Sequence, residues 1–254
     1  MTILSVTRDV CAAVGVLLPS SVFSNLAGNR TMQEMLACAN ETAQRIAYDQ
    51  RDWTRLRTTA VYTGDGQYVP PLPDPYAVWT GSTAFPLPAN YKRMLLTSSV
   101  WRTTWGAQPM RFVADTDEWI VRRLSFSDDS MWGEWTIFGG QIHIWPIMAG
   151  ASPGVPAETA YHTYLDKNCV ALASGGFGDS FLADGDSFVL DERLLKLGMI
   201  ADWKQKKGAA YAEDLETFGT ALSMAMGHDS PAPILVDGRR NAISTRGGWG
   251  AYLN

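Results

Sequence analysis

The sequence is poor in cysteine and in histidine, and the few that it has lack the spacing of a known site. The cysteines are Cys11, Cys38 and Cys169. Three cysteines at unrelated spacing fit buried reduced thiols better than a disulfide framework or a zinc site. The histidines are His143, His162 and His228. They form no H-x-x-x-H or H-E-x-x-H pattern, so we expect neither a metal site nor a catalytic triad.

The sequence also lacks a long apolar segment. The longest apolar run, Cys11 to Leu18, has eight residues including Gly15, whereas a membrane-spanning helix needs about 20. A secretion signal is not expected, because Arg8 is followed at once by Asp9 and no clear small-residue cleavage pattern is present. We therefore expect a protein that is made and kept in a cytoplasm.

Charged residues are scarce as well. They make up 19% of the 254 residues, and the 21 basic and 26 acidic side chains give a net charge of −5. No basic run is longer than Lys206-Lys207 or Arg239-Arg240, which disfavours tight sequence-specific DNA binding. By contrast, the chain has 10 Trp, 9 Tyr and 9 Phe. Few charges and many aromatic rings are typical of subunit interfaces, so assembly into an oligomer is one explanation.

Helical spacing dominates the first 55 residues. Ser5 is the expected N-cap of a first helix, and Pro19 is its expected end. One face of that helix carries apolar residues at a spacing of four, three and four: Val6, Val10, Ala13 and Leu17. A capping box over Thr31–Glu34 predicts the start of a second helix. Its stripe continues this rhythm over about six turns: Met32, Leu36, Ala39, Ala43, Ile46, Gln50 and Trp53.

The section from residue 56 to 170 is rich in strand-forming residues. The clearest pair of strands is Trp135–Phe138 and Gln141–Trp145, joined by Gly139-Gly140. This pattern predicts a β-hairpin, because both glycines tolerate the positive φ that a two-residue turn requires. One helix is expected in this section, over Asp115–Leu124.

Helical spacing returns between residues 171 and 228. Asp191 and Glu192 mark the start of one helix, and Gly208 marks its end. Two apolar stripes follow from the spacing: Leu190, Leu194, Leu197 and Ala201, then Tyr211, Leu215, Phe218, Leu222 and Met226. Residues 229–254 have no helical period but many apolar residues, so we expect an extended arm that docks on a partner.

Together these patterns predict an α+β fold. We expect an antiparallel helical bundle formed by the N- and C-terminal helices, with an inserted β-rich domain and an extended C-terminal arm. The expected boundaries are 1–55 for the N-terminal helices, 56–170 for the β-rich insertion, 171–228 for the C-terminal helices and 229–254 for the arm.

No motif in the sequence carries a recognisable chemistry. Four aspartates lie close together: Asp179, Asp184, Asp186 and Asp191. They fail the pattern of an EF-hand calcium loop, because Gly185 at the glycine position puts Leu182 at a ligand position. A turn at Asp184-Gly185 and acids in the first turn of the next helix explain them better. The run Gly175–Gly178 lacks the Gly-Lys-Ser/Thr of a P-loop, and no G-x-S-x-G elbow is present. We predict no catalytic residue, no metal and no cofactor, and a protein that is not an enzyme.

Several stretches nevertheless recur, in the same order, in one protein family. Leu87–Met94 resembles its Leu-Pro-Ala-Asp-Phe-x-Arg-Met segment, with Asn90 at the Asp position. Trp135–Pro146 resembles its Trp-x-Ile-x-Gly-Gly-x-Ile-x-x-x-Pro hairpin, and Tyr161 and Tyr164 resemble its Tyr-x-x-Tyr strand. Its Asp-x-Asp-x-Phe stretch and the helix that follows are similar to Asp184, Asp186, Phe188, Leu194-Leu195, Trp203-Lys204 and Lys207-Gly208. On these residues the chain resembles the head-to-tail adaptor proteins of tailed bacteriophages, also called connector or head-completion proteins.

The resemblance implies a virion structural protein. Such adaptors form a homo-oligomeric ring, commonly of twelve subunits, that docks under the portal protein, closes the DNA-filled head and meets a tail or nozzle protein. A C-terminal extension reaches up the portal, and DNA passes through the lumen without sequence-specific binding. The implied location is the head–tail junction, after synthesis in the host cytoplasm. In this chain the expected portal contacts are Ile234, Arg239, Arg240, Trp249 and Tyr252.

Two other functions stay open. Seven of the ten tryptophans lie between Trp79 and Trp145, which would suit a carbohydrate-binding or cell-wall-degrading phage tail protein, although such residues are more often core or interface. The third possibility is a cytoplasmic assembly factor that is absent from the mature particle.

Overall fold

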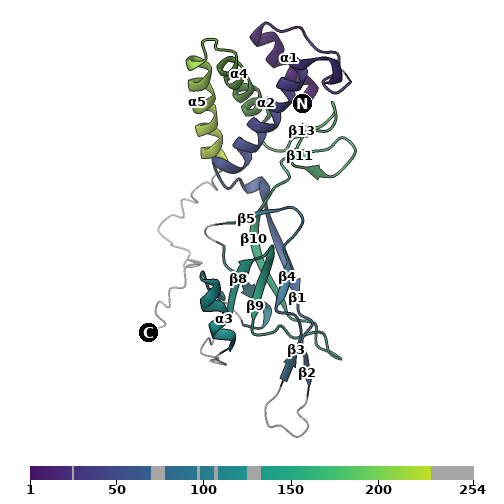
Figure 1. Ribbon diagram of the computed structural model, residues 1–254, viewed down its shortest axis with the longest axis vertical. Coiled ribbons are helices and arrows are strands. Elements are labelled where there is room, and N and C mark those ends of the chain that lie inside the picture. The colour runs from purple at the N-terminus through teal and green to yellow at the C-terminus, as the bar shows by residue number, and fades with distance from the viewer. Residues whose placement is uncertain (25, 70–77, 96–97, 106–107, 125–132, 230–254) are drawn as a thin grey trace, which may run out of the picture. The chain divides into compact units, whose positions relative to one another are not determined.

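The protein divides into two compact units. The structure, a computed structural model, describes residues 1–24, 26–69, 78–95, 98–105, 108–124 and 133–229 (Figure 1). The helical unit is built from Met1–Thr58, Asn90–Leu95 and residues 165–229. The β-rich unit is built from Thr59–Ala89 and Leu96–Tyr164.

Both units contain helices. The α-helices are α1 (Ile3–Val14), α2 (Arg30–Gln44), α4 (Glu192–Lys206) and α5 (Ala212–Asp229) in the helical unit, and α3 (Thr116–Leu124) in the β-rich unit. Short 3-10 turns cover Leu26–Gly28, Thr54–Leu56 and Thr103–Trp105, and a π-turn covers Arg45–Asp49 after α2. In the part of the chain that the structure describes, no helix combines the length and the apolar character needed to cross a bilayer.

Polar side chains cap the first two helices, at positions that differ from the expected ones. α1 begins after Thr2, whose hydroxyl accepts from the Ser5 amide at 3.4 Å, while the Ser5 hydroxyl accepts from the Thr2 amide at 3.0 Å. Ser5 is therefore the N3 residue of a capping box and not the N-cap. α2 begins after Asn29, whose side chain accepts from the Met32 amide. The expected capping box at Thr31 is wrong, because Asn29 already provides the cap.

The end of α1 also differs from the expectation. Gly15 adopts the left-handed conformation, with φ of 72°, and donates its amide to the carbonyl of Cys11, which closes the helix one turn before Pro19. Val6 and Val10 are buried as expected, but Leu17 lies beyond the helix and is 90% exposed.

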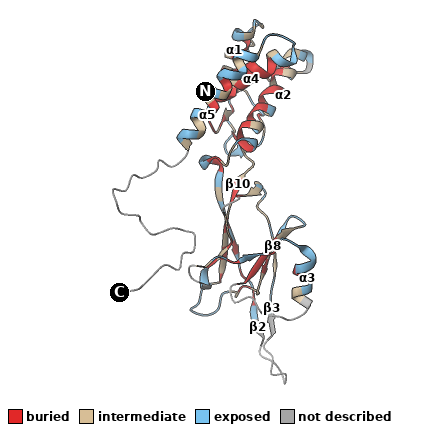
Figure 2. Ribbon diagram, turned by 90° about the vertical axis from the view of Figure 1, so that its left-hand side faces the viewer, coloured by how far each residue is buried: buried red, intermediate tan, exposed pale blue. Residues whose placement is uncertain are grey.

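α4 is the central helix of the helical unit. It packs against α1, α2 and α5, and Figure 2 shows buried residues where these helices meet. Its buried side chains point in several directions: Leu194, Leu195, Met199, Ile200, Asp202 and Trp203. At Gly198 a Cβ would lie 2.6 Å from the methyl carbon of Thr42 on α2, so this glycine allows the close approach of the two helices.

The predicted arrangement of the helices is therefore wrong. The protein is an α+β fold, but the N- and C-terminal helices, α1 and α5, do not form the expected antiparallel bundle. The physical reason is the burial of α4 on several faces, which makes it the helix that the others surround. Apolar stripes in the sequence identify one buried face per helix, and they do not indicate which helix lies in the centre.

Short strands build four sheets in the described residues. The strands are β1 (Arg57–Thr63), β2 (Gln67–Val69), β3 (Val78–Thr80), β4 (Ala84–Pro86), β5 (Tyr91–Met94), β6 (Trp101–Arg102), β7 (Arg111–Phe112), β8 (Glu134–Phe138), β9 (Gln141–Trp145), β10 (Thr159–Asp166), β11 (Val170–Ala171), β12 (Phe177–Gly178) and β13 (Ser187–Phe188). The orders are β1-β10-β5 with β6 paired to β10, β4-β9-β8-β7, β2-β3, and β12-β11-β13.

The predicted hairpin and the predicted helix of the β-rich section are confirmed. β8 and β9 pair antiparallel, with Trp135 opposite Ile144, and the glycines of the turn have φ of 61° and 73°. Ile142 and Ile144 of β9 are buried on the same face, as the two-residue period of a strand requires. α3 covers the expected segment to within one residue.

The β-rich unit also buries an ion pair. Arg102 and Glu158 bind each other, and each side chain is only 4% exposed. Arg102 also donates to the carbonyls of Pro146 at 2.8 Å and Ile147 at 2.9 Å, and Glu158 accepts from the Ala149 amide at 3.1 Å. The surrounding backbone thus satisfies the polar atoms of the pair, which a buried charge requires.

Candidate functional site

The predicted portal contacts lie outside the described residues. They are Ile234, Arg239, Arg240, Trp249 and Tyr252, and all belong to residues 230–254, which we call the C-terminal segment. The description of the chain ends at Asp229, the last residue of α5. The candidate site that the structure resolves is therefore the root of this segment, in the helical unit.

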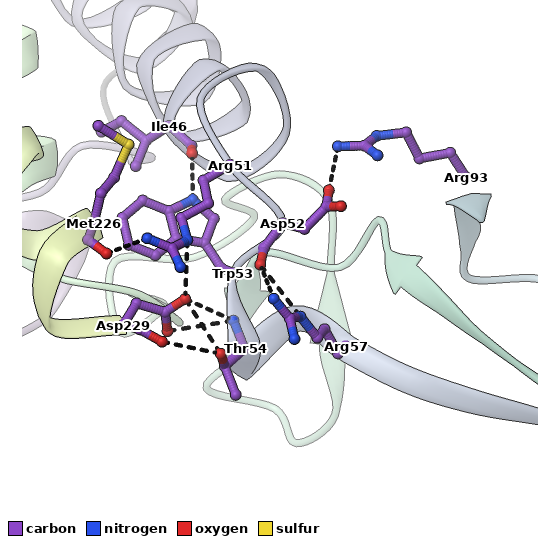
Figure 3. A network of polar contacts seen from close by, with 9 residues as sticks. All are labelled: Ile46, Arg51, Asp52, Trp53, Thr54, Arg57, Arg93, Met226 and Asp229. Atoms are coloured by element: carbon purple, nitrogen blue, oxygen red, sulfur yellow. Dashed lines mark hydrogen bonds and ion pairs between the residues drawn. The ribbon is translucent and has the colours of Figure 1, made fainter. Parts of the chain in front are cut away.

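An arginine closes the end of α5. The carbonyls in the last turn of a helix have no partner within the helix, and Arg51 donates through Nη1 to one of them, that of Met226. The Nε of Arg51 also lies 3.6 Å from the carboxylate of Asp229. A cation at this position is favoured by the negative end of the helix dipole. Figure 3 shows the guanidinium of Arg51 between these two partners.

Asp229 in turn caps the 3-10 turn Thr54–Leu56. Its carboxylate accepts from the Thr54 amide at 3.0 and 3.3 Å and from the Thr54 hydroxyl at 3.2 Å. The same hydroxyl lies 3.3 Å from the Asp229 carbonyl. We call Arg51, Thr54 and Asp229 the root clasp. It joins the last turn of α5 to the segment that leads into β1 (Figure 3).

Buried and charged neighbours hold this segment in place. The Trp53 ring is 4% exposed, and its indole nitrogen donates to the Ile46 carbonyl at 2.7 Å. Asp52 binds Arg93 of β5 through its carboxylate, and its carbonyl accepts from Arg57 at 2.9 and 3.3 Å. These contacts fix the segment that contains Arg51 and Thr54 of the root clasp.

A hollow lies beside the root clasp. It is lined by Trp53, Arg55, Leu190, Asp191, Glu192, Leu194, Ala225, His228 and Asp229. The apolar lining residues come from the core, and the carboxylates come from the start of α4 and the end of α5. Asp191 is the N-cap of α4 and accepts from the Arg193 amide at 2.8 Å, one position before the first turn in which we expected it. The hollow thus combines apolar, acidic and basic side chains, and no serine, cysteine or lysine nucleophile is among its lining residues.

The histidines are not brought together. Burial lowers the pKa of His162 to about 4. Its ring stacks on Tyr62 at a centroid distance of 5.6 Å. Burial also lowers the pKa of His143, which stacks on Phe138 at 3.8 Å, while His228 is exposed at the end of α5. Among the described residues, no group of three His, Cys, Asp or Glu side chains is placed to hold a metal ion.

The aspartates after the glycine-rich run have roles that the sequence did not reveal. Asp184 accepts from the Ser21 hydroxyl and from the amides of Val22 at 2.7 Å and Phe23 at 3.3 Å. Asp186 is 1% exposed and accepts from three amides, those of Ala173 at 2.8 Å, Leu182 at 2.6 Å and Ala183 at 2.8 Å. Both carboxylates serve to fix loops. The Asp-x-Asp spacing was the signal available in the sequence, but the amides bound by Asp184 lie about 160 positions away.

A second polar cluster lies in the β-rich unit. Glu134 of β8 is 2% exposed and pairs with Arg122 and Arg123 of α3, each at 2.6 Å. The guanidinium of Arg123 lies 4.3 Å from the ring centroid of Trp119 and 4.7 Å from that of Trp145. These contacts attach α3 to the hairpin, as cation–π and ion pairs do in a partly dry site.

The tryptophans whose side chains the structure describes do not form an exposed platform. Four of them are buried and two are half-buried: Trp53, Trp119, Trp135 and Trp203, then Trp101 and Trp145. This arrangement gives the carbohydrate-binding alternative no specific support.

Comparison of the chain with models of protein families gave no match, and comparison with curated proteins gave none either.

Proposed function

We propose that the chain is a virion structural protein of a tailed bacteriophage. Its copies assemble into an adaptor ring that docks under the portal, closes the DNA-filled head and connects it to the tail. DNA passes through the lumen of this ring, and the role of the protein is structural, without catalysis.

The first support comes from the residues on which the family resemblance depends. Asp186 fixes three loop amides, and Leu194, Leu195 and Trp203 are buried in α4. Arg93 binds Asp52, which lies two residues before Thr54 of the root clasp. The residues of the resemblance thus have structural roles in this fold. Structural roles are compatible with an assembly protein, whose function does not depend on a catalytic site.

The root clasp is the observation that best supports a contact between the C-terminal segment and the portal. It fixes the end of α5 on the helical unit, so the C-terminal segment starts from a defined point. This segment contains Ile234, Leu235, Val236, Ile243, Trp249, Tyr252 and Leu253, and also Arg239, Arg240 and Arg246. Aromatic and arginine side chains carry much of the binding energy at protein interfaces. A C-terminal segment of this composition, attached at a fixed point of the helical unit, is suited to docking on a portal.

Deletion of the C-terminal segment tests this function. Removal of residues 230–254 leaves Asp229 and the root clasp in place, so the helical unit keeps its fold. We expect the shortened chain to lose binding to purified portal in a pull-down or by surface plasmon resonance. Undiminished binding would contradict the proposal. Phe177→Ser is the matched control, because Phe177 is 64% exposed in the same unit but far from the segment in sequence; it should bind like the wild type.

The proposed location has its own test. Mass spectrometry of purified virions should detect the chain at a copy number expected for a ring. Its absence from mature particles would favour the assembly factor.

A further inference from the structure

The loop that follows α1 exposes two leucines to solvent. Leu17 is 90% exposed and Leu18 is 56% exposed, and we call them the exposed leucine pair. Single exposed apolar residues are common on protein surfaces, and two adjacent exposed leucines give this loop a small apolar surface.

Hydrogen bonds hold this loop in place. Arg8 of α1 donates through Nε to the Pro19 carbonyl at 2.8 Å. Asp184 accepts from the Ser21 hydroxyl and from the Val22 amide at 2.7 Å. The loop is therefore ordered before any partner arrives, so a contact made by the exposed leucine pair avoids most of the entropic cost of ordering a loop on binding.

A positive charge accompanies the exposed leucine pair. Arg8 is exposed and donates to backbone carbonyls only, and within the described residues no carboxylate pairs with it. The neighbouring Asp9 is engaged by Lys196 at 2.9 Å. This edge of the helical unit thus presents two leucines beside a guanidinium that no carboxylate of the described residues pairs with.

α5 presents a surface with the complementary properties. Its outer face has a shallow depression lined by Glu216, Gly219, Thr220, Ser223 and Met224. The Ser223 hydroxyl donates to the Gly219 carbonyl at 2.9 Å, so it is satisfied within the helix. Met224 is 63% exposed, and a Cβ at Gly219 would meet nothing within 4 Å. The depression is therefore shallow and open, and nothing in it blocks the approach of an apolar side chain.

The charge of this face is opposite to that of Arg8. α5 contains Glu213, Asp214 and Glu216 in its first two turns and neither lysine nor arginine. Asp214 is paired with Lys204 of α4 at 2.6 Å, while Glu213 and Glu216 are exposed. The depression thus has a negative charge at its rim.

We infer that the exposed leucine pair of one copy occupies the α5 depression of the next copy, with Arg8 facing Glu216. In this contact, apolar side chains meet an open depression, and the exposed guanidinium of Arg8 meets an exposed carboxylate. The inference rests on the proposed function, which requires contacts between copies, and it assigns the surfaces that make them.

The contact repeats from copy to copy. α1 and α5 both pack against α4, and α5 uses Phe218 and Leu222 for its buried face. The depression on the outer face of α5 is therefore separate from the exposed leucine pair of the same copy. A pair of bound copies still has one unfilled depression, on one copy, and one unused leucine pair, on the other, which is a heterologous interface. Such interfaces build closed rings when the rotation between copies permits it.

A pair of engineered cysteines tests the contact. Leu17→Cys and Ser223→Cys, combined in the full-length chain, place one thiol on each proposed surface. The three native cysteines are 0% exposed and will not compete. On mild oxidation of the portal-bound protein, we expect a ladder of three or more linked copies on a non-reducing gel. Each single variant has one new thiol per copy and can link at most two copies.

A charge substitution provides the second measurement. Leu17→Glu should weaken association between full-length copies by about a hundredfold, as measured by sedimentation with and without portal. Phe177→Glu, at another exposed apolar position of the same unit, should associate like the wild type. This inference would be overturned if rings form but the cysteine pair gives no ladder, and if the Leu17→Glu variant still forms rings. The proposed function would survive that result. A wild-type chain that stays monomeric even on the portal would overturn both.

Discussion

Single carboxylates hold the loops of the helical unit. Asp186 is the clearest case, because its buried side chain accepts from the amides of Ala173, Leu182 and Ala183. Burial opposes ionisation of this carboxyl, but the three amides outweigh it and hold its pKa below the ordinary value. The ionised form therefore stabilises the fold.

The first prediction concerns Asp186→Asn. A neutral amide accepts these hydrogen bonds less well, and we expect the free energy of unfolding at pH 7 to fall by about 2 kcal/mol. The wild-type carboxylate contributes at pH values above its unfolded pKa of about 3.9, and this contribution is lost as the pH falls through the lower folded value. The difference between variant and wild type should therefore shrink in acid. Urea unfolding at pH 7 and pH 3 measures both effects.

Asp179→Asn is the matched control for this substitution. Asp179 is exposed, and its carboxylate contacts the Ser180 hydroxyl at 3.1 Å. Its replacement should change stability by less than about 0.5 kcal/mol. Equal losses for the two variants would show that the buried amide contacts contribute nothing.

Two glycines in helices lead to opposite predictions at the scale of elements. Gly198 of α4 lies where a Cβ would be 2.6 Å from the Thr42 methyl and 3.1 Å from the Phe218 ring. Gly198→Ala should destabilise the protein by about 1–3 kcal/mol through overpacking. Gly219→Ala in α5 meets open space, so its better helix propensity should stabilise by up to about 1 kcal/mol. Thermal unfolding of both variants tests this, and a stabilising Gly198→Ala would refute the close helix approach.

Local chemistry explains which elements the sequence predicted well. The Gly139-Gly140 turn and the alternation around Ile142 and Ile144 specify the hairpin within about ten residues. The start of α2 was misplaced by two residues, because Asn29 and Thr31 both have side chains that can cap a helix. The central position of α4 was missed, since that position depends on partners distant in the chain, such as Thr42 and Phe218.

The candidate site was less predictable for the same reason. Arg51 and Asp229 are 178 positions apart, and nothing near either residue in the sequence signals their contact. The same holds for Asp184 and the amides of Val22 and Phe23. The expected portal residues lie outside the described part of the chain and stay a prediction.

For the whole molecule, the three thiols report on the integrity of the helical unit. Cys11, Cys38 and Cys169 all belong to this unit and are 0% exposed. Burial raises the pKa of each thiol, and together with the nearby charge of Asp202 it raises that of Cys38 to about 11. Because the thiolate is the reactive form, we expect almost no reaction of the native protein with a thiol reagent at pH 8. Three equivalents should react in urea. A thiol that reacts at once in the native protein would contradict the described core.

The root clasp also determines how the molecule would carry force. A pull on the chain beyond Asp229 would load the hydrogen bonds of its carboxylate with Thr54 and the contact of Arg51 with the end of α5. Tension would then pass to the segment that leads into β1 without first unwinding α5. Because several bonds of the root clasp share the load, it would resist such a pull better than a frayed helix end.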